Sequence, residues 1–280
     1  MLQHRDIDKR KKNISKLKDI ISALRSIAAV RYQQSHQPVS GLRQYRDVVE
    51  DSMSLLKEYW PRMEAEEEVV ARSLVIVFCS EYGFVGGFNR PILKTVKLQA
   101  DDADIALIGT RGTLLAAEYG IKPVWALPMS SDYMSVQKTT KEIANQVFSA
   151  VEKGVSSVEL VYTELDDREG AKVVKRSLIP VELEAIPKRN RKRNLPLLNM
   201  PPDELLGYLT EEYLMTSISC TVMESLHAEN HGRLNAMDQA HHNIEKKHEQ
   251  LQHMSRQQWQ EEITTELLDI ITGFTAQKCF

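Results

Sequence analysis

Residues 74–89 have the sequence LVIVFCSEYGFVGGFN. The first six residues are apolar and have the length of a strand, and residues 104–109, DIALIG, form a second, mostly apolar run. Continuous apolar runs of this length are typical of strands that are buried on both faces of a parallel sheet. Glycines punctuate the segment after the first run, and a helix is expected over residues 89–98. We therefore predict a strand, a loop and a helix in that order at the start of an α/β domain.

Strands and helices continue to alternate after this unit. Helices are expected at residues 111–119 and 136–152, and further strands at residues 158–162 and 173–183. This alternation indicates an open α/β sheet. Residues 70–195 are accordingly predicted to form an α/β domain.

Glycine and proline are distributed unevenly along the 280 residues. Of the 12 Gly and 10 Pro, 16 lie in residues 83–202, three come before this range and three after it. Because these residues mark turns and break helices, their scarcity elsewhere predicts two long helical arms, over residues 1–60 and 203–280. Pro38 and Gly41 interrupt the first arm, where a kink or a short break is expected.

Both arms carry apolar residues at heptad spacing. In the first arm one position repeats every seven residues, a second lies three residues later, and two isoleucines widen the stripe. These positions are Ile7, Ile14, Ile21 and Ala28, then Leu17 and Leu24, then Ile20 and Ile27. In the second arm the two registers are Met223, Met237, Ile244 and Leu251, then Leu226, Ala240 and Met254. A narrow apolar stripe on a projecting helix needs a second helix, so the arms are predicted to form one antiparallel coiled coil.

Composition narrows the class of protein. The hydrophobic fraction of 42% and the charged fraction of 27% are globular proportions, which exclude a disordered or collagen-like chain. A net charge of −3 gives the whole chain no cationic field for nucleic acid. No apolar run approaches the ~20 residues that span a bilayer, and the three Cys are too scattered for a zinc site or a disulfide framework. The chain is predicted to be cytosolic or peripheral to a membrane.

Three features invite an enzyme or binding interpretation, and each has a simpler structural explanation. The loop at residues 80–89 opens a helix, where phosphates often bind, but it lacks the Gly-Lys-Ser/Thr ending and the dinucleotide glycine spacing. The basic run at residues 188–193 lies between prolines, as solvated loops do. His227 and His231 have a spacing that can bind a metal, although the zincin pattern is missing. We predict no catalytic residue, no cofactor site and no metal site.

Three motifs together point to a known family. Residues 80–89 match the signature Ser-Asp-Arg-Gly-Leu-Cys-Gly-Gly-Leu-Asn at Ser80, Gly83, Gly86, Gly87 and Asn89, and they replace its acid, base and cysteine by Glu81, Tyr82 and Val85. Residues 229–243, ENHGRLNAMDQAHHN, are similar to Glu-x-x-Ala-Arg-Met-x-Ala-Met-x-x-Ala-x-x-Asn. Residues 263–273, ITTELLDIITG, match Ile-Thr-x-Glu-Leu-x-Glu-Ile-x-x-Gly. By these motifs the chain resembles a divergent gamma subunit of F-type ATP synthases, the central rotor shaft.

The resemblance is weakest in the first arm and just before residue 263. Where the family has Thr-x-Lys-Ile-Thr-x-Ala-Met, residues 17–24 read LKDIISAL. The family's Arg-Gln pair becomes Trp259-Gln260. The chain therefore lacks that arginine for contact with catalytic beta subunits.

The resemblance implies a rotor that performs no chemistry of its own and needs no cofactor. The paired arms would insert into a ring of alternating alpha and beta subunits, and the Rossmann-like α/β domain with the lower coil would meet the epsilon subunit and the membrane ring subunits. The chain would be peripheral, on the cytoplasmic side of the bacterial inner membrane, with no nucleic-acid partner. By the same resemblance, the expected beta contacts are Gln260, Thr264 and Glu266. The expected structural motif of the rotor comprises Gly83, Gly86, Gly87, Asn89, Glu229, Arg233 and Met237.

Two other functions remain open from the residues alone. An α/β enzyme or nucleotide-binding domain with a coiled-coil dimerisation arm predicts that the central domain binds a ligand. A coiled-coil scaffold, or a nucleic-acid adaptor that uses residues 188–193, predicts salt-sensitive binding to polyanions.

Overall fold

The structure is a computed structural model that describes residues 2–56, 72–99, 102–166, 168, 170–181 and 197–277. The chain divides into two compact units, a smaller one of Met1–Ile27 with Asn235–Phe280 and a larger one of Ala28–Leu234. Two long helices, α1 Leu2–Leu56 and α5 Pro202–Gln277, contribute to both units. No helix within the described ranges has a stretch long and apolar enough to cross a membrane.

Five strands form a mixed sheet in the larger unit. They are β1 Arg72–Phe78, β2 Asp104–Ile108, β3 Trp125–Leu127, β4 Val155–Asp166 and β5 Gly170–Ile179. Their order is β3-β2-β1-β4-β5, in which the first four strands are parallel and β5 pairs antiparallel with β4. The helices between them are α2 Asn89–Lys97, α3 Thr110–Ala116, η2 Ala117–Tyr119, η3 Tyr133–Ser135 and α4 Val136–Glu152. This arrangement confirms the open α/β sheet that the sequence predicts.

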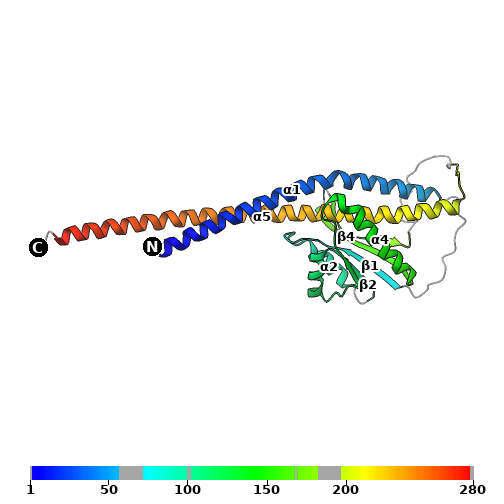
Figure 1. Cartoon of the computed structure of the whole chain (residues 1–280), viewed down its shortest axis with the longest axis horizontal. Helices are drawn as coiled ribbons and strands as arrows, with labels where there is room; N and C mark the ends of the chain where they lie inside the picture. Colours follow the sequence, from blue (N-terminus) through cyan, green and yellow to red (C-terminus); the bar gives the residue numbers. More distant parts are fainter. Residues whose placement is uncertain are drawn as a thin grey trace. The chain divides into compact units, whose positions relative to one another are not determined.

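Both faces of the sheet are covered, which explains the continuous apolar run in β1. Val75 and Val77 pack with α2 and α3 on one face. Leu74, Ile76 and Phe78 pack with α4 and with the α1 and α5 segments of this unit on the other face (Figure 1). Because successive strand side chains alternate between faces, a strand covered on both sides needs apolar residues at every position.

The observed elements differ most from the predicted ones at three strands. β4 runs from Val155 to Asp166 and is therefore longer at both ends than the predicted 158–162. β3 escapes sequence prediction because it has only three residues. Trp125, Ala126 and Leu127 are apolar, but a run this short does not identify a strand. β5 ends at Ile179, before the predicted end at residue 183, because Pro180 has no N–H to donate to the ladder. Residues 182 and 183 lie outside the described residues.

Helix α1 continues through Pro38, so the predicted short break is wrong. A proline inside a helix removes a hydrogen bond and costs about 3 kcal/mol. The flanking Ser35 and Val39 are buried, and Val39 belongs to the core that covers the sheet. Tertiary packing on both sides of Pro38 thus outweighs the local preference for a break.

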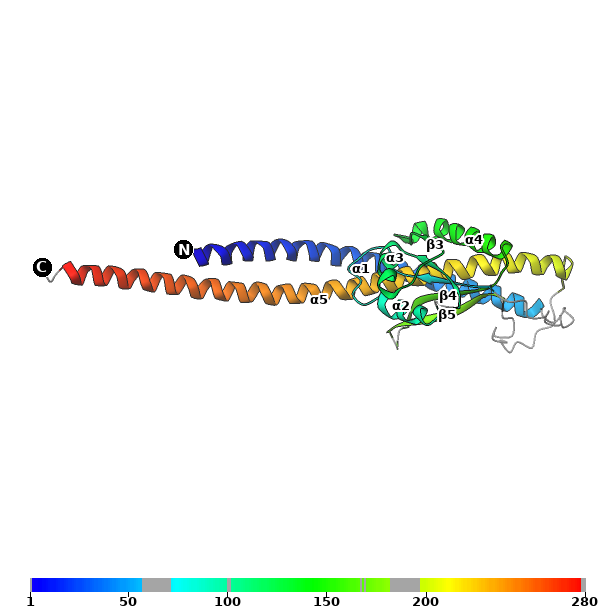
Figure 2. The same ribbon diagram turned by 90° about the horizontal axis from the view of Figure 1, so that it is seen from below.

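In the smaller unit α1 and α5 run antiparallel, side by side (Figure 1 and Figure 2). Lys18 Nζ lies 3.0 Å from Glu245 Oε1, and Arg25 forms an ion pair with Asp238. The buried residues of the seam between the helices in this unit are Ile7, Met237 and Leu251. These contacts confirm the predicted antiparallel coiled coil.

The second predicted seam position holds only in part in this unit, where Leu24 and Ala240 are half-buried but two other residues are exposed. Leu17 is 47% exposed and Met254 is 51% exposed. Ile20 and Ile27, expected to widen the stripe, are exposed as well. Near the start of α1 the seam instead continues four residues after its first position, at the half-buried Lys11 and Lys18. Seam residues in a heptad are separated alternately by three and by four residues. If the wrong separation is assumed first, the predicted second position falls on the outer face of the helix.

Helix α5 extends beyond the start of α1. The two ion pairs fix one register, in which Leu2 comes opposite Glu261. No described residue of α1 lies opposite the segment that follows. Ile263 of that segment is half-buried, but the large apolar side chains of Leu267, Leu268 and Ile270 are exposed. The end of α5 therefore presents apolar surface to the surroundings of the chain.

Gly112 of α3 packs directly on the end of β1, where a Cβ would lie 1.9 Å from Cys79 Cβ. We expect Gly112→Ala to lower the free energy of unfolding by about 3 kcal/mol, because the clash forces α3 away from the sheet. Gly41→Ala is the control, since a Cβ there meets nothing within 4 Å. In a helix interior this control should gain about 0.5–1 kcal/mol. Urea unfolding measures both, and equal stabilities of the two variants would contradict the packing at Gly112.

Candidate functional site

The loop between β1 and α2 docks on α5 within the larger unit, and its contacts define a loop–helix junction of Glu81, Gly83, Glu229, Asn230 and Arg233. Oε2 of Glu229 accepts a hydrogen bond from the Glu81 N–H at 3.2 Å, and Oε1 pairs with the Arg233 guanidinium. Arg233 Nε donates to the Gly83 carbonyl at 3.4 Å, and Nη1 donates to Asn230 Oδ1 at 3.1 Å. The structure thus brings Gly83, Glu229 and Arg233, which lie far apart in the sequence, into one contact.

The junction is a buried ion pair. Glu229 is 2% exposed. Burial raises the pKa of Glu229, while the Arg233 guanidinium and the N–H groups of Glu81 and Tyr82 oppose that rise. Removing one partner of a buried pair leaves the other charge uncompensated. Both side chains are therefore needed to keep the loop on the helix.

Glu81 ties three segments together at the carboxyl edge of the sheet. Its Oε2 accepts hydrogen bonds from the Thr110 N–H at 3.0 Å and the Met129 N–H at 2.8 Å, and Oε1 accepts from Thr110 Oγ1 at 2.7 Å. Thr110 opens α3, and Met129 follows β3. The acidic position of the signature therefore has a structural role, which Glu81 performs in place of aspartate.

The other signature residues shape the loop itself. Asn89 Oδ1 accepts from the Ser80 N–H at 2.9 Å, and Asn89 Nδ2 donates to Ser80 Oγ at 2.8 Å, with both residues buried. Gly86 has φ of 59°, a left-handed backbone that favours glycine. At Gly83 and Gly87 a Cβ would meet nothing within 4 Å. Close packing therefore does not require glycine at those two positions.

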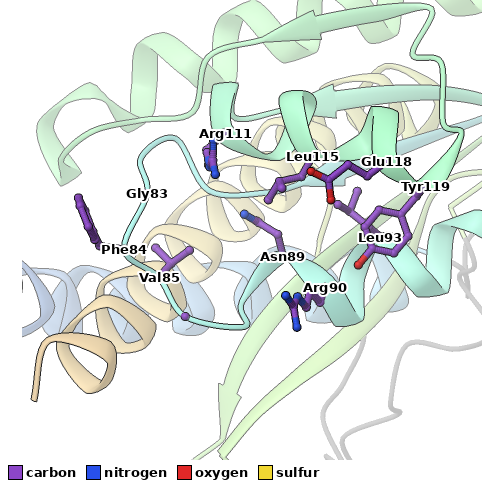
Figure 3. Close-up of a pocket in the computed structure, with 11 residues that line it drawn as sticks. Gly83, Phe84, Val85, Asn89, Arg90, Leu93, Arg111, Leu115, Glu118 and Tyr119 are labelled. Carbon is purple, nitrogen blue, oxygen red and sulfur yellow. The ribbon is translucent and has the colours of Figure 1, made fainter. Parts of the chain in front are cut away.

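A cleft of about 590 Å³ opens beside the loop, between α2 and α3 (Figure 3). Its lining includes Arg90, Arg111 and Glu118, all exposed, so charges of both signs face it. Its one buried polar side chain, Asn89, is already hydrogen-bonded to Ser80. The cleft is where a nucleotide-binding domain would hold its ligand, yet its charged groups do not converge on one kind of ligand.

The residues predicted to contact a partner lie on α5 in the smaller unit. Gln260, Thr264 and Glu266 are all exposed, and Thr264 Oγ1 donates to the Gln260 carbonyl at 2.7 Å. Trp259, next to them in sequence, is also exposed. Met237 belongs to the same unit, where it is buried in the seam. These four predicted residues are therefore separate from the loop–helix junction, and the basic run at 188–193 lies outside the described residues.

His227 lies in the contact between α1 and α5 in the larger unit. Its Nδ1 is 2.7 Å from Ser35 Oγ, and its ring stacks on Tyr32 with centroids 4.6 Å apart. Burial first, and then the neighbouring positive groups, lower the pKa of His227 to about 4. Those groups are His36, Arg43 and His231, and Glu224 acts in the opposite direction. Among the residues that the structure describes, no three His, Cys, Asp or Glu form a group that could hold a metal ion.

The buried imidazole of His227 predicts a loss of stability in mild acid. Its pKa is about 4 in the folded chain against 6.5 for a free imidazole, so the unfolded chain takes up the proton first as the pH falls through this window. We expect the free energy of unfolding to fall by about 3 kcal/mol across it. His227→Phe should flatten the profile, and His253→Phe, at an exposed position, should not. Urea unfolding at a series of pH values measures these free energies. If the free energy of unfolding depends on pH in the same way for the wild type and for His227→Phe, His227 is not the group responsible.

Comparison with known proteins places the chain in a family. The family model described as ATP synthase matches residues 3–276. The chain belongs to the ATP synthase family. A relative named ATP synthase gamma chain, from Lachnoclostridium phytofermentans, is 27% identical and the match covers 99% of both chains. Another gamma chain, from Bdellovibrio bacteriovorus, is 25% identical over 99% of this chain and 100% of the relative.

A solved structure has the same fold. It is a chain from the OSCP/F1/c-ring part of the Euglena gracilis mitochondrial ATP synthase in rotational state 3. The TM-score is 0.68 at 16% identity, and the match covers 98% of this chain and 94% of the other. The fold of this ATP synthase family member is thus shared along almost its full length.

A partly buried charge cluster in the larger unit has no counterpart among the sequence predictions for this ATP synthase family member. It comprises Arg43, Arg46, Glu50, Glu164, Arg176 and Glu224. Glu224 of α5 is 2% exposed, and its Oε1 lies 2.8 Å from Arg43 Nε and 3.8 Å from Arg46 Nη1. The available signal was a lone acid inside the otherwise uncharged stretch 220–226, CTVMESL. Heptad spacing alone gives no reason to bury it.

Proposed function

We propose that this chain is the central-stalk rotor subunit of a bacterial F-type ATP synthase or ATPase. The observation that carries the proposal is the likeness to gamma chains along the whole length, which includes both helical arms and the domain between them. A rotor chain of the Euglena gracilis mitochondrial ATP synthase supports it, with a TM-score of 0.66 over 93% of this chain and 99% of that one. A partial likeness would have been compatible with a shared domain in an unrelated protein.

In this function the smaller unit enters a ring of alternating alpha and beta subunits. Exposed apolar side chains in this unit, among them Ile20, Leu267 and Ile270, give it the kind of surface that a partner covers. Gln260, Thr264 and Glu266 contact the beta subunits from the exposed surface of α5. The turning shaft presents a different side to each beta subunit and thereby drives the catalytic sites through different states.

The larger unit meets the epsilon subunit and the membrane ring subunits. The chain is peripheral to the bacterial inner membrane, on its cytoplasmic side, and it is a non-catalytic subunit without a cofactor. The continuity of α1 through Pro38 suits a shaft that transmits torque, because a break would act as a hinge. The loop–helix junction and the charge cluster would hold the α/β domain to the shaft as it turns.

Co-expression with alpha and beta subunits from neighbouring genes tests this function. We expect a soluble complex whose ATPase activity depends on the presence of this chain. A cysteine introduced as Gln260→Cys should crosslink to beta, and one introduced as Lys97→Cys at the end of α2 should not. An equally active complex that assembles without this chain, together with no crosslink from position 260, would overturn the proposal.

A further inference from the structure

We propose that the loop after β1 is an anion-binding site whose resident ligand is the carboxylate of Glu229, so that α5 binds the α/β domain as a tethered carboxylate. The chemical class of ligand is a small carboxylate, and acetate corresponds to the part of the side chain beyond Cβ. This inference does not depend on the rotor function, because every group in it lies in the larger unit of the chain.

The geometry around the carboxylate is that of a bound anion. The N–H groups of Glu81 and Tyr82 both face Glu229, and the Glu81 N–H donates to Oε2 at 3.2 Å. The Arg233 guanidinium supplies the positive charge at Oε1. Successive backbone N–H groups and a guanidinium are the donors that proteins use for carboxylates and phosphates. In this structure the anion they hold is a side chain of α5.

The place in the fold is one where ligands ordinarily bind. In open α/β sheets, ligands sit outside the carboxyl ends of parallel strands, beside loops that lead from strand to helix. The loop that receives Glu229 leads from β1 to α2 at that edge. A nucleotide phosphate would have to displace the Glu229 carboxylate before it could reach these N–H groups. This occupancy argues against the alternative of a nucleotide-binding domain.

The receiving groups should remain in position when the carboxylate is removed. Arg233 has two other partners, the Gly83 carbonyl and the Asn230 side chain. Glu81 is held by its own carboxylate at Thr110 and Met129. Truncation of Glu229 therefore leaves an acetate-sized space lined by donors and a positive charge, whereas truncation of an apolar neighbour leaves a space without them.

The test is thermal unfolding of the full chain carrying Glu229→Ala, at constant ionic strength, with chloride replaced stepwise by acetate. We expect the melting temperature to fall by roughly 10 °C without acetate, because a buried cation loses its partner. Acetate should restore a large part of that loss along a saturating, one-site curve. Acetamide has the same shape without the charge and should restore none of it.

The control is Val222→Ala, which removes a fully buried apolar side chain from the same helix. Acetate should leave the melting temperatures of this variant and of the wild type unchanged. Equal effects of acetate on all three chains, or equal effects of acetate and acetamide on Glu229→Ala, would overturn the proposal.

A second measurement applies if Glu229→Ala does not fold. Glu229→Gln keeps an acceptor oxygen and loses the charge. Hydrogen exchange of the Glu81 and Tyr82 amides should then accelerate about tenfold or more relative to the wild type, while amides within β1 keep their rates. Unchanged exchange at both loop amides would overturn the proposal, because those amides would then not depend on the anion.

Discussion

Glu224→Ala is expected to lower the free energy of unfolding by about 3 kcal/mol. Glu224 is buried on α5 and faces two arginines of α1, Arg43 at 2.8 Å and Arg46 at 3.8 Å. Arg46 is itself mostly buried, with 11% of its side chain exposed. Removing the carboxylate takes from both cations their shared and most buried partner, although Arg43 keeps Glu164 at 3.3 Å and Arg46 keeps Glu50 at 3.9 Å. Part of the charge compensation inside the cluster is therefore lost.

Urea unfolding of the full chain measures this effect, and Glu211→Ala is the matched control. Glu211 lies on the same helix but is exposed. Surface substitutions of this kind change stability by about 0.5 kcal/mol or less. A Glu224→Ala chain as stable as the Glu211→Ala chain would show that the cluster does not hold α1 to α5.

Replacing Leu267, Leu268 and Ile270 together by serine should weaken assembly with the alpha and beta subunits about 100-fold. Each of these side chains is more than half exposed in the isolated chain. Their burial in the ring would contribute roughly 1 kcal/mol apiece, and about 2.8 kcal/mol in total corresponds to that factor. The stability of the chain itself should change little, because these residues pack on no α1 residue within the described part of the chain.

Two measurements separate these effects. Urea unfolding of the triple variant reports the isolated chain, and titration of the purified alpha–beta ring reports assembly. Replacing Glu249, Gln250 and Arg256 by serine is the control, since these residues are exposed on the same helix and polar. Assembly that is weakened equally by both triple variants, or by neither, would contradict an apolar contact at the end of α5.

The α/β domain could be predicted because its signals are local. β1 is buried on both faces, so its apolar run is unbroken, and α4 was predicted with its observed bounds. β3 could not be predicted in this way, because its three residues lie at the edge of the sheet and form an apolar run too short to identify a strand. Continuity at Pro38 depends on packing around Ser35 and Val39, which the sequence near Pro38 does not reveal.

In the coiled coil, heptad periodicity alone does not determine which residues occupy the second seam position. Ile7, Ile14 and Ile21 identify the first seam position, but a heptad allows the second to follow after three residues or after four. Near the start of α1 the half-buried Lys11 and Lys18 follow the step of four and Leu17 is exposed. One repeat later the half-buried Leu24 follows the step of three. The choice depends on the partner helix, whose ion pairs to Lys18 and Arg25 set the register.

The candidate site was predictable only as a set of residues. The motifs identify Gly83, Glu229 and Arg233 as members of the site. They do not reveal that the Glu229 carboxylate binds the backbone of the loop that contains Gly83. That pairing is a long-range contact between segments about 150 residues apart. Neither spacing nor composition carries information about such a contact.

Rotation of the chain within its assembled complex tests the central claim most directly. Leu98→Cys gives an attachment point on the larger unit, at a side chain that is 86% exposed. Cys79 and Cys220 should not react, because burial raises the pKa of each thiol to about 12. Cys279 is replaced by serine.

With the alpha–beta ring fixed to a surface, a probe on position 98 should turn in one direction when ATP is added and stop when ATP is removed. ATP hydrolysis at an unchanged rate while the probe stays still would contradict the account.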